Sequence, residues 1–124
     1  MNSINIKGSG AFPTVILDPE KGIFEISGRS LPEDVASFYS PILSWLDQYV
    51  ASPKQKTVFE FKLTYYNTAS SKLLLNIMLK LEEIGKKGYD VLVKWHYPED
   101  DEDLQEAGEE YADLVDIPFE QVSV

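Results

Sequence analysis

The feature that most constrains the fold is a helical pattern enclosed by two strand patterns. Residues Thr57–Leu63 alternate as a half-buried or internal strand does. Residues Lys72–Lys87 then repeat apolar side chains at helical spacing, and Tyr89–Tyr97 forms a second strand pattern that ends before Pro98. Two strands joined through a helix need a crossover, which predicts parallel pairing and a right-handed connection. The chain is therefore expected to have an α/β fold.

Two short β-rich runs precede this unit. They are Thr14–Leu17 and Gly22–Ser27, and the segment between them, Asp18–Gly22, has the proline and glycine of a tight turn. We therefore expect a β-hairpin. A third short strand is expected around Ile4–Ile6.

Two further helices and a terminal strand complete the predicted order of elements. The apolar spacing of Val35–Val50 predicts an amphipathic helix, with a kink or a split at Pro41. Residues Asp100–Val115 predict an acidic helix, and Phe119–Val124 is expected as an optional edge strand. The whole chain, residues 1–124, is predicted to be a single domain with a four- or five-stranded mixed sheet and helices packed against it.

The charge of the chain is unevenly distributed. Residues Met1–Lys94 contain 11 basic and 10 acidic side chains, whereas Trp95–Val124 contain 11 acidic side chains and neither lysine nor arginine. Such a block repels phosphate backbones and anionic lipids, so we expect no nucleic-acid and no membrane partner. It is either a solvated helix face or a docking surface for a basic partner, and the sequence leaves both open.

Motifs for catalysis, cofactors or export are sparse. The chain has no cysteine and only one histidine, His96, which excludes disulfides, thiolate metal sites and histidine relays. The glycine motifs for nucleotides and the esterase elbow are absent. Residues Lys7–Gly10 precede no helix pattern, and Asp100–Asp103 lack the spacing of a calcium loop. We expect no metal and no cofactor, and the amino-terminal residues, which lack an export signal, predict a cytoplasmic protein.

The most informative stretch is Tyr65–Ser71, a polar hinge between a strand and the leucine-rich helix. One interpretation is structural, with Asn67 or Thr68 as the N-cap of a helix that starts near Ala69. The other is that Thr68 or Ser70 is a phosphorylation site, because a phosphate there would meet the positive end of the helix dipole. Composition alone favours the N-cap.

Three separated motifs resemble those of the SiaC family of bacterial regulatory phosphoproteins. The first is Tyr65–Lys72 with the helix that follows it, the second is Trp95–Asp103 with Glu106–Glu109, and the third is Phe38–Ile42 with Trp45 and Leu46. The likeness covers nearly the whole chain. It implies a STAS-like fold, similar to that of anti-sigma-factor antagonists, which place a phosphorylatable hydroxyl at a helix start after a strand.

The resemblance implies a switch protein that is not an enzyme. The family's phosphorylated threonine corresponds to Thr68, with a dedicated kinase and a PP2C-type phosphatase acting on it. The unphosphorylated form would bind an effector, in the best-known case a diguanylate cyclase that makes cyclic di-GMP and so controls biofilm formation. The expected partner-binding residues surround that threonine: Tyr65, Tyr66, Asn67, Ala69, Ser70 and Ser71.

Two other classes of function stay open at this point. One is a small enzyme, or the accessory subunit of one, that uses carboxylates of the acidic tail with His96 as acid–base groups. The absence of a recognisable nucleophile or cofactor motif disfavours it. The other is a purely structural interaction domain, in which Thr68 would serve only as a helix cap.

Overall fold

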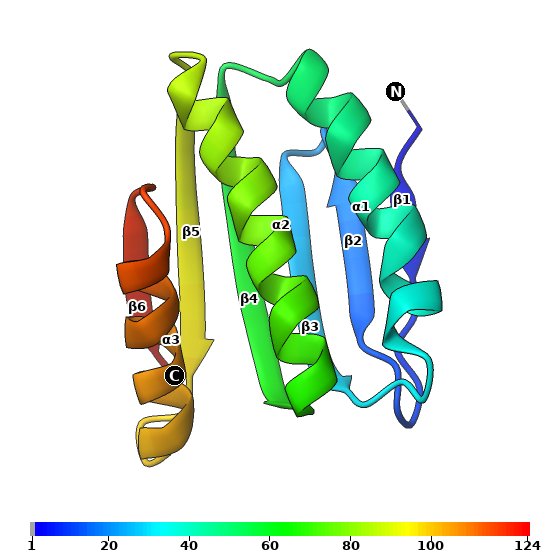
Figure 1. Cartoon of the computed structure of the whole chain (residues 1–124), viewed down its shortest axis with the longest axis vertical. Coiled ribbons are helices and arrows are strands. Elements are labelled where there is room, and N and C mark those ends of the chain that lie inside the picture. Colours follow the sequence, from blue (N-terminus) through cyan, green and yellow to red (C-terminus); the bar gives the residue numbers. More distant parts are fainter. Residues whose placement is uncertain (1) are drawn as a thin grey trace.

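The computed structural model describes residues 2–124 as one mixed α/β domain with a six-stranded sheet and three helices (Figure 1). The elements are, in chain order, β1 (Ile4–Ile6), β2 (Thr14–Asp18), β3 (Ile23–Ser30), α1 (Val35–Ala51), β4 (Lys56–Tyr66), α2 (Thr68–Lys86), β5 (Asp90–Tyr97), α3 (Glu102–Leu114) and β6 (Phe119–Ser123). The α/β class and the order of elements are as predicted.

The strands lie side by side in chain order, β1-β2-β3-β4-β5-β6. Strands β1, β2 and β3 pair antiparallel, so the predicted hairpin is confirmed. Strands β3 to β6 pair parallel, with one helix in each connection, which confirms the parallel pairing expected from the β4-α2-β5 pattern.

The predicted count of four or five strands is wrong, because both terminal strands join the sheet. Ile4–Ile6 pairs with β2, and Phe119–Ser123 pairs with β5. These runs contain only three and five residues, so the sequence carries little periodicity there. Their partners, rather than their own pattern, make them strands.

All three helices cover the same face of the sheet (Figure 1). Along β4, Phe59 and Phe61 are fully buried toward the helices, whereas the neighbouring Glu60 and Lys62 alternate to the other face. The uncovered face carries ion pairs, among them Lys62 Nζ to Glu25 Oε2 at 3.1 Å. The core therefore lies between one face of the sheet and the three helices.

A kink or a split was expected at Pro41, and the split is wrong, because α1 runs unbroken through this residue. Proline removes one backbone donor, and its own side chain is exposed here. Tyr39 and Ile42, on either side of it, are fully buried. The residues before and after Pro41 therefore both pack against the core.

Strand β4 extends beyond the predicted end at Leu63. Tyr65 and Tyr66 are its last two residues and lie opposite Arg29 and Ser30 of β3. The expected hinge is therefore shorter than predicted and consists of Asn67 alone, followed directly by α2. The long parallel neighbour β3 supplies the backbone partners that keep the two tyrosines in the sheet.

The three helices begin at the same edge of the sheet, where β3, β4 and β5 end (Figure 1). Each has an N-cap whose side chain accepts a hydrogen bond from a backbone amide, namely Asp34, Asn67 and Asp101. None of the helices described for residues 2–124 is both long and apolar enough to cross a bilayer.

Candidate functional site

Of the two residues expected as the N-cap of α2, Asn67 and Thr68, the structure shows Asn67 in this role. Its backbone is extended, and its side-chain Oδ1 accepts a hydrogen bond of 2.8 Å from the Ser70 amide. Its own amide donates to the Ser30 carbonyl at 3.1 Å. Asn67 thus ends the strand, starts the helix and fixes the turn to β3.

Ser70 lies inside the protein, in a chain of buried hydroxyl groups that joins three elements. The Ser70 hydroxyl donates to the Ser30 carbonyl at 3.1 Å, and its oxygen lies 3.0 Å from Ser30 Oγ. Ser30 Oγ in turn lies 2.6 Å from the Tyr39 hydroxyl of α1. One set of proton positions satisfies every contact: Tyr39 donates to Ser30 Oγ, which donates to Ser70 Oγ.

Burial raises the pKa of Tyr39, with the bond to Ser30 acting in the opposite direction, so the phenol stays protonated and keeps its donor. A fully buried Ser70 cannot touch a partner directly. Its place in this chain of hydroxyls holds the first turn of α2 against α1 and β3.

Thr68 is the first residue of α2 and is exposed, as is Ala69 after it. No hydrogen bond of the described residues uses the backbone amides of Thr68 and Ala69. These two donors point out from the positive end of the helix dipole. Of the two hydroxyls considered for phosphorylation, Thr68 therefore lies at the surface beside open donors, and Ser70 does not.

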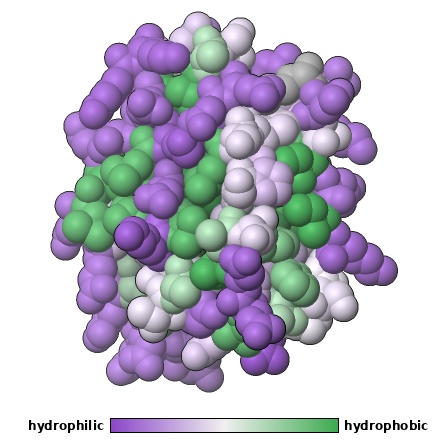
Figure 2. Space-filling model, turned by 45° about the vertical axis from the view of Figure 1, so that its right-hand side comes forward, coloured by the Kyte–Doolittle hydropathy of each residue, from purple (hydrophilic) through white to green (hydrophobic). Residues whose placement is uncertain are grey.

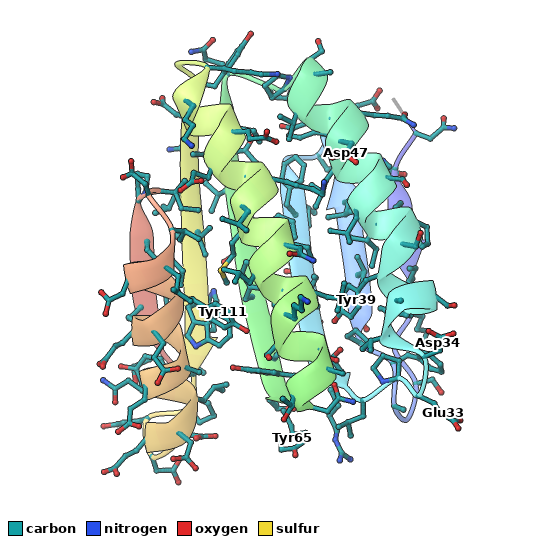
Figure 3. All side chains as sticks on the ribbon, viewed as in Figure 1. Glu33, Asp34, Tyr39, Asp47, Tyr65 and Tyr111 are labelled. Atoms are coloured by element: carbon teal, nitrogen blue, oxygen red, sulfur yellow. The ribbon has the colours of Figure 1, made fainter. Side chains whose placement is uncertain are left out.

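The two tyrosines at the end of β4 have different surroundings. Tyr65 is 55% exposed and points away from the sheet edge into solvent, next to the start of α2 (Figure 3). Tyr66 is half-buried, and its ring meets the Trp95 ring edge-on at a centroid distance of 6.1 Å. Burial raises the pKa of Tyr66. Tyr65 is thus an accessible contact, whereas Tyr66 is mainly packed against β5.

Helix α3 packs beside the start of α2 through Tyr111, which lies between the two helices (Figure 3). Its hydroxyl donates to the Ser71 carbonyl at 2.8 Å. Burial first, and the nearby Tyr66 second, raise the pKa of Tyr111 well above its usual value. The sequence interpretation gave no hydrogen-bonding role to Ser30, Tyr39 or Tyr111. The bonds that join Ser70 to Ser30 and Tyr111 to Ser71 link residues 40 positions apart, which no local motif marks.

Two adjoining hollows lie against α3, one beside the end of β4 and the other beside the first turns of α2. One, of about 310 Å³, lies against Tyr65, Tyr66, Leu104 and Ala107, and the other, of about 300 Å³, lies against Tyr66, Leu75, Ala107 and Tyr111. Larger hollows of about 450, 430 and 610 Å³ lie elsewhere, and none of them is lined by a residue of the β4–α2 turn. Of these hollows, the smaller pair is lined by residues of the stretch Tyr65–Ser71.

The structure separates His96 from the carboxylates of α3. His96 Nε2 lies 3.0 Å from Glu60 Oε1 on the uncovered face of the sheet, whereas α3 packs on the opposite face. Asp101 is occupied as the N-cap of α3, accepting from the Leu104 amide at 2.9 Å. Among residues 2–124, no group of three or more His, Cys, Asp or Glu side chains is arranged to hold a metal ion.

Comparison with known proteins places this architecture among regulatory proteins. Residues 6–124 match the family model described as SiaC family regulatory phosphoprotein. An uncharacterised protein of Pseudomonas aeruginosa (strain UCBPP-PA14) is 28% identical over 119 residues, which are 96% of this chain and 94% of the relative.

Solved structures agree with this result. SiaC of Pseudomonas aeruginosa matches with a TM-score of 0.89 and 26% identity over 100% of both chains. The crystal structure of diguanylate cyclase SiaD in complex with its activator SiaC, from the same organism, contains a match with a TM-score of 0.91 and 26% identity, over 98% of this chain and 99% of the other. Because the family model spans almost the whole chain, the protein belongs to the SiaC family of regulatory phosphoproteins.

Proposed function

We propose that this protein is a non-enzymatic signalling adaptor controlled by phosphorylation of Thr68. The unphosphorylated form binds and regulates an effector, and phosphorylation releases it. The effector is a diguanylate cyclase, because the similar SiaC of Pseudomonas aeruginosa is the activator of the cyclase SiaD. A dedicated kinase adds the phosphate, a PP2C-type phosphatase removes it, and the exchange takes place in the cytoplasm.

The observation that carries this proposal is the exposed Thr68 hydroxyl at the start of α2. A modifying enzyme can reach it without opening the core, whereas Ser70 is fully buried. Tyr65 and Ala69 beside it are also exposed, so a partner that covers Thr68 meets a small and partly apolar surface.

The fold tolerates a phosphate at this position. Phosphorylation adds a charge of about −1.5 to −2, which the positive end of the helix dipole favours. The open amides of Thr68 and Ala69 can donate to the phosphate oxygens. Lys72 lies one turn further along α2, at the spacing where a cation meets an anion at position 68. The modified chain therefore keeps its fold while this part of its surface changes charge.

A partner that docks over Thr68 would have to remove water from the dianion. Without cations that meet the phosphate, this desolvation costs several kcal/mol. A change of about 5.5 kcal/mol moves a two-state population from one side almost fully to the other. One phosphate is therefore sufficient as a switch.

The first experiment asks whether the modification exists. Protein isolated from its native host is analysed by intact mass and then by fragmentation. We expect a fraction heavier by one phosphate, with the added mass on Thr68. Purified protein with no modified fraction under any growth condition, or with the phosphate on another residue, would contradict the proposal.

The second experiment measures binding to the diguanylate cyclase of the same host, together with its production of cyclic di-GMP. Thr68→Ala is expected to bind and activate like the wild type, and Thr68→Asp to bind at least about tenfold more weakly. Ser44→Asp places the same charge on an exposed residue of α1 and serves as the matched control. Equal binding by both Thr68 variants and the wild type would show that this residue is not the switch.

A further inference from the structure

The two hollows form one groove along α3, which runs first between α3 and the end of β4 and then between α3 and the first turns of α2. They share Tyr66 and Ala107, so the first opens directly into the second. On the α2 side, Ser71, Lys72 and Leu75 line the groove. Thr68 stands three and four residues before Ser71 and Lys72, and so lies on the same stripe of the helix. The exposed threonine is therefore at one end of this groove.

The floor of the groove is apolar and includes one small side chain, that of Ala107. Leu104 lies at one end, Leu75 and Leu114 lie at the other, and Tyr66 and Ala107 line both hollows between them. Leu114 is 62% exposed, which makes it one of the most exposed large apolar side chains among the described residues. Because the Ala107 side chain is small, space remains above it for larger side chains of a partner.

The rim of the groove is acidic. Asp101, Asp103 and Glu110 line it on the α3 side, and Lys72 is the only cation among its lining residues. Of the 13 residues of α3, six are acidic and none is basic. With three acidic side chains against one lysine, the lining has a net negative charge, which attracts a partner of the opposite sign.

The surface shown in Figure 2 is different. Around α1 and the β1 edge, hydrophobic side chains form separate patches divided by hydrophilic ones. The groove beside α3 instead combines an apolar floor, an acidic rim and a position next to Thr68.

We propose that this groove docks a basic amphipathic helix of the effector, an inference that rests on the proposed function and names the chemistry of its partner. Leucine-like side chains of the partner fill the floor, and its lysines or arginines pair with the α3 rim. Asp103 and Glu110 are seven residues apart, two helical turns or roughly 10 Å, so basic residues two turns apart on the partner helix match them.

The groove and Thr68 have separate roles in this arrangement. Pairing along the acidic rim makes binding depend on salt, because screening weakens attraction between exposed charges. The contact over Thr68, Tyr65 and Ala69 makes binding depend on phosphorylation, because this end of the surface is partly apolar.

The test uses the full chain, isotopically labelled, and three synthetic peptides as probes. One is an amphipathic helix of leucine and lysine, one has glutamate in place of lysine, and one has the leucine–lysine sequence scrambled. We expect the first alone to shift the amide resonances of the groove residues Tyr66, Ser71, Leu75, Ala107 and Leu114. Raising the salt concentration from about 50 to 500 mM should weaken its binding.

Charge reversal tests the rim. The double variant Asp103→Lys and Glu110→Lys should bind the basic peptide about tenfold more weakly or worse. Glu109→Lys is the control, because Glu109 is exposed on the same helix but does not line the groove. The amide spectrum of each variant shows whether it is folded, and Leu114→Ser tests the apolar contact at an exposed position that folding does not need.

Several results would overturn the docking inference. The acidic peptide could bind as tightly as the basic one, or the amide shifts could map to residues outside the groove. Glu109→Lys could lose as much peptide binding as the double variant. Amide shifts that grow with protein concentration in the absence of peptide would indicate that a second copy occupies the groove. If the peptides behave as expected but Thr68→Asp leaves cyclase binding unchanged, the switch is wrong and the groove stands. If Thr68→Asp blocks the cyclase and no peptide binds, the groove is wrong and the switch stands.

Discussion

The Tyr111 hydroxyl of α3 donates a 2.8 Å hydrogen bond to the Ser71 carbonyl, in the first turn of α2. The Tyr111 ring also packs on Trp95 at a centroid distance of 5.3 Å, and the Trp95 Nε1–H donates to the Leu104 carbonyl at 2.9 Å. Helix α3 is therefore tied both to the sheet and to the turn that carries Thr68.

Removing the Tyr111 hydroxyl tests this connection. Tyr111→Phe keeps the ring and loses one hydrogen bond, so the free energy of unfolding should fall by about 0.5 to 1.5 kcal/mol. Urea denaturation measures the change, and hydrogen exchange should become faster in the first turn of α2. The exposed Tyr65 is the control, since Tyr65→Phe should change stability by less than about 0.5 kcal/mol. Equal effects of the two substitutions would contradict the prediction.

The buried phenols predict a loss of stability in alkali. Burial raises the pKa of Tyr39, Tyr66 and Tyr111 in the folded state. The unfolded chain then loses these protons at lower pH than the native chain, so stability is constant below the ordinary tyrosine pKa of about 10 and falls above it. Urea denaturation at several pH values from 8 to 11 should show this fall, and Tyr111→Phe should reduce its slope. A slope that is the same in both proteins would remove Tyr111 as a cause.

The buried hydroxyl chain predicts that Ser70 contributes to folding. Ser70→Ala leaves the Ser30 carbonyl and the Ser30 hydroxyl without this partner in the core, at a cost of about 1 to 3 kcal/mol. Ser71 is the matched control, because its hydroxyl makes an exposed bond of 2.6 Å to the Thr68 carbonyl. Ser71→Ala should cost less than about 0.5 kcal/mol in the same chemical denaturation. The reverse order would show that the hydroxyl chain does not stabilise the fold.

The N-cap predicts a local effect at the start of α2. Asn67→Ala removes the acceptor of the Ser70 amide and should lower stability by about 1 kcal/mol. Asn67→Asp keeps a side-chain oxygen and should stay close to the wild type. Thermal unfolding measures both, and hydrogen exchange of the Ser70 amide reports the cap directly. If Asn67→Ala protects this amide as well as the wild type does, the cap is not the stabilising contact.

A close approach between α3 and the sheet predicts that Gly108 cannot be replaced. A Cβ there would overlap with Trp95 Cδ1 and would lie 2.6 Å from Gln121 Nε2. Alanine normally stabilises a helix interior by about 1 kcal/mol relative to glycine, but overpacking costs about 1 to 3 kcal/mol. We expect Gly108→Ala to be destabilising overall, and Glu109→Ala, one residue further on and exposed, to be neutral. A stabilised Gly108→Ala in denaturant would mean that α3 can move away from Trp95 at little cost.

The long periodic segments were predictable because periodicity reports which side of an element is buried. Strand β4 alternates between buried and open positions, and α2 repeats its buried side chains at helical spacing, so both could be assigned from the sequence. Strands β1 and β6 could not be counted with certainty, and Tyr65 and Tyr66 could not be assigned to β4. In each case the neighbouring strand supplies the hydrogen bonds that the local sequence does not announce.

The candidate site divides in the same way. The sequence by itself determined where a strand meets a helix, that Asn67 and Thr68 stand at this junction, and that the last 30 residues carry no positive charge, because these are properties of neighbouring residues. Only the tertiary structure decided that Ser70 is buried and Thr68 exposed, and that α3 forms a groove beside them. The contacts responsible join Ser70 to Ser30 and Tyr111 to Ser71, both pairs 40 residues apart. Residues so distant meet only when the sheet orders its strands, and no local pattern encodes that meeting.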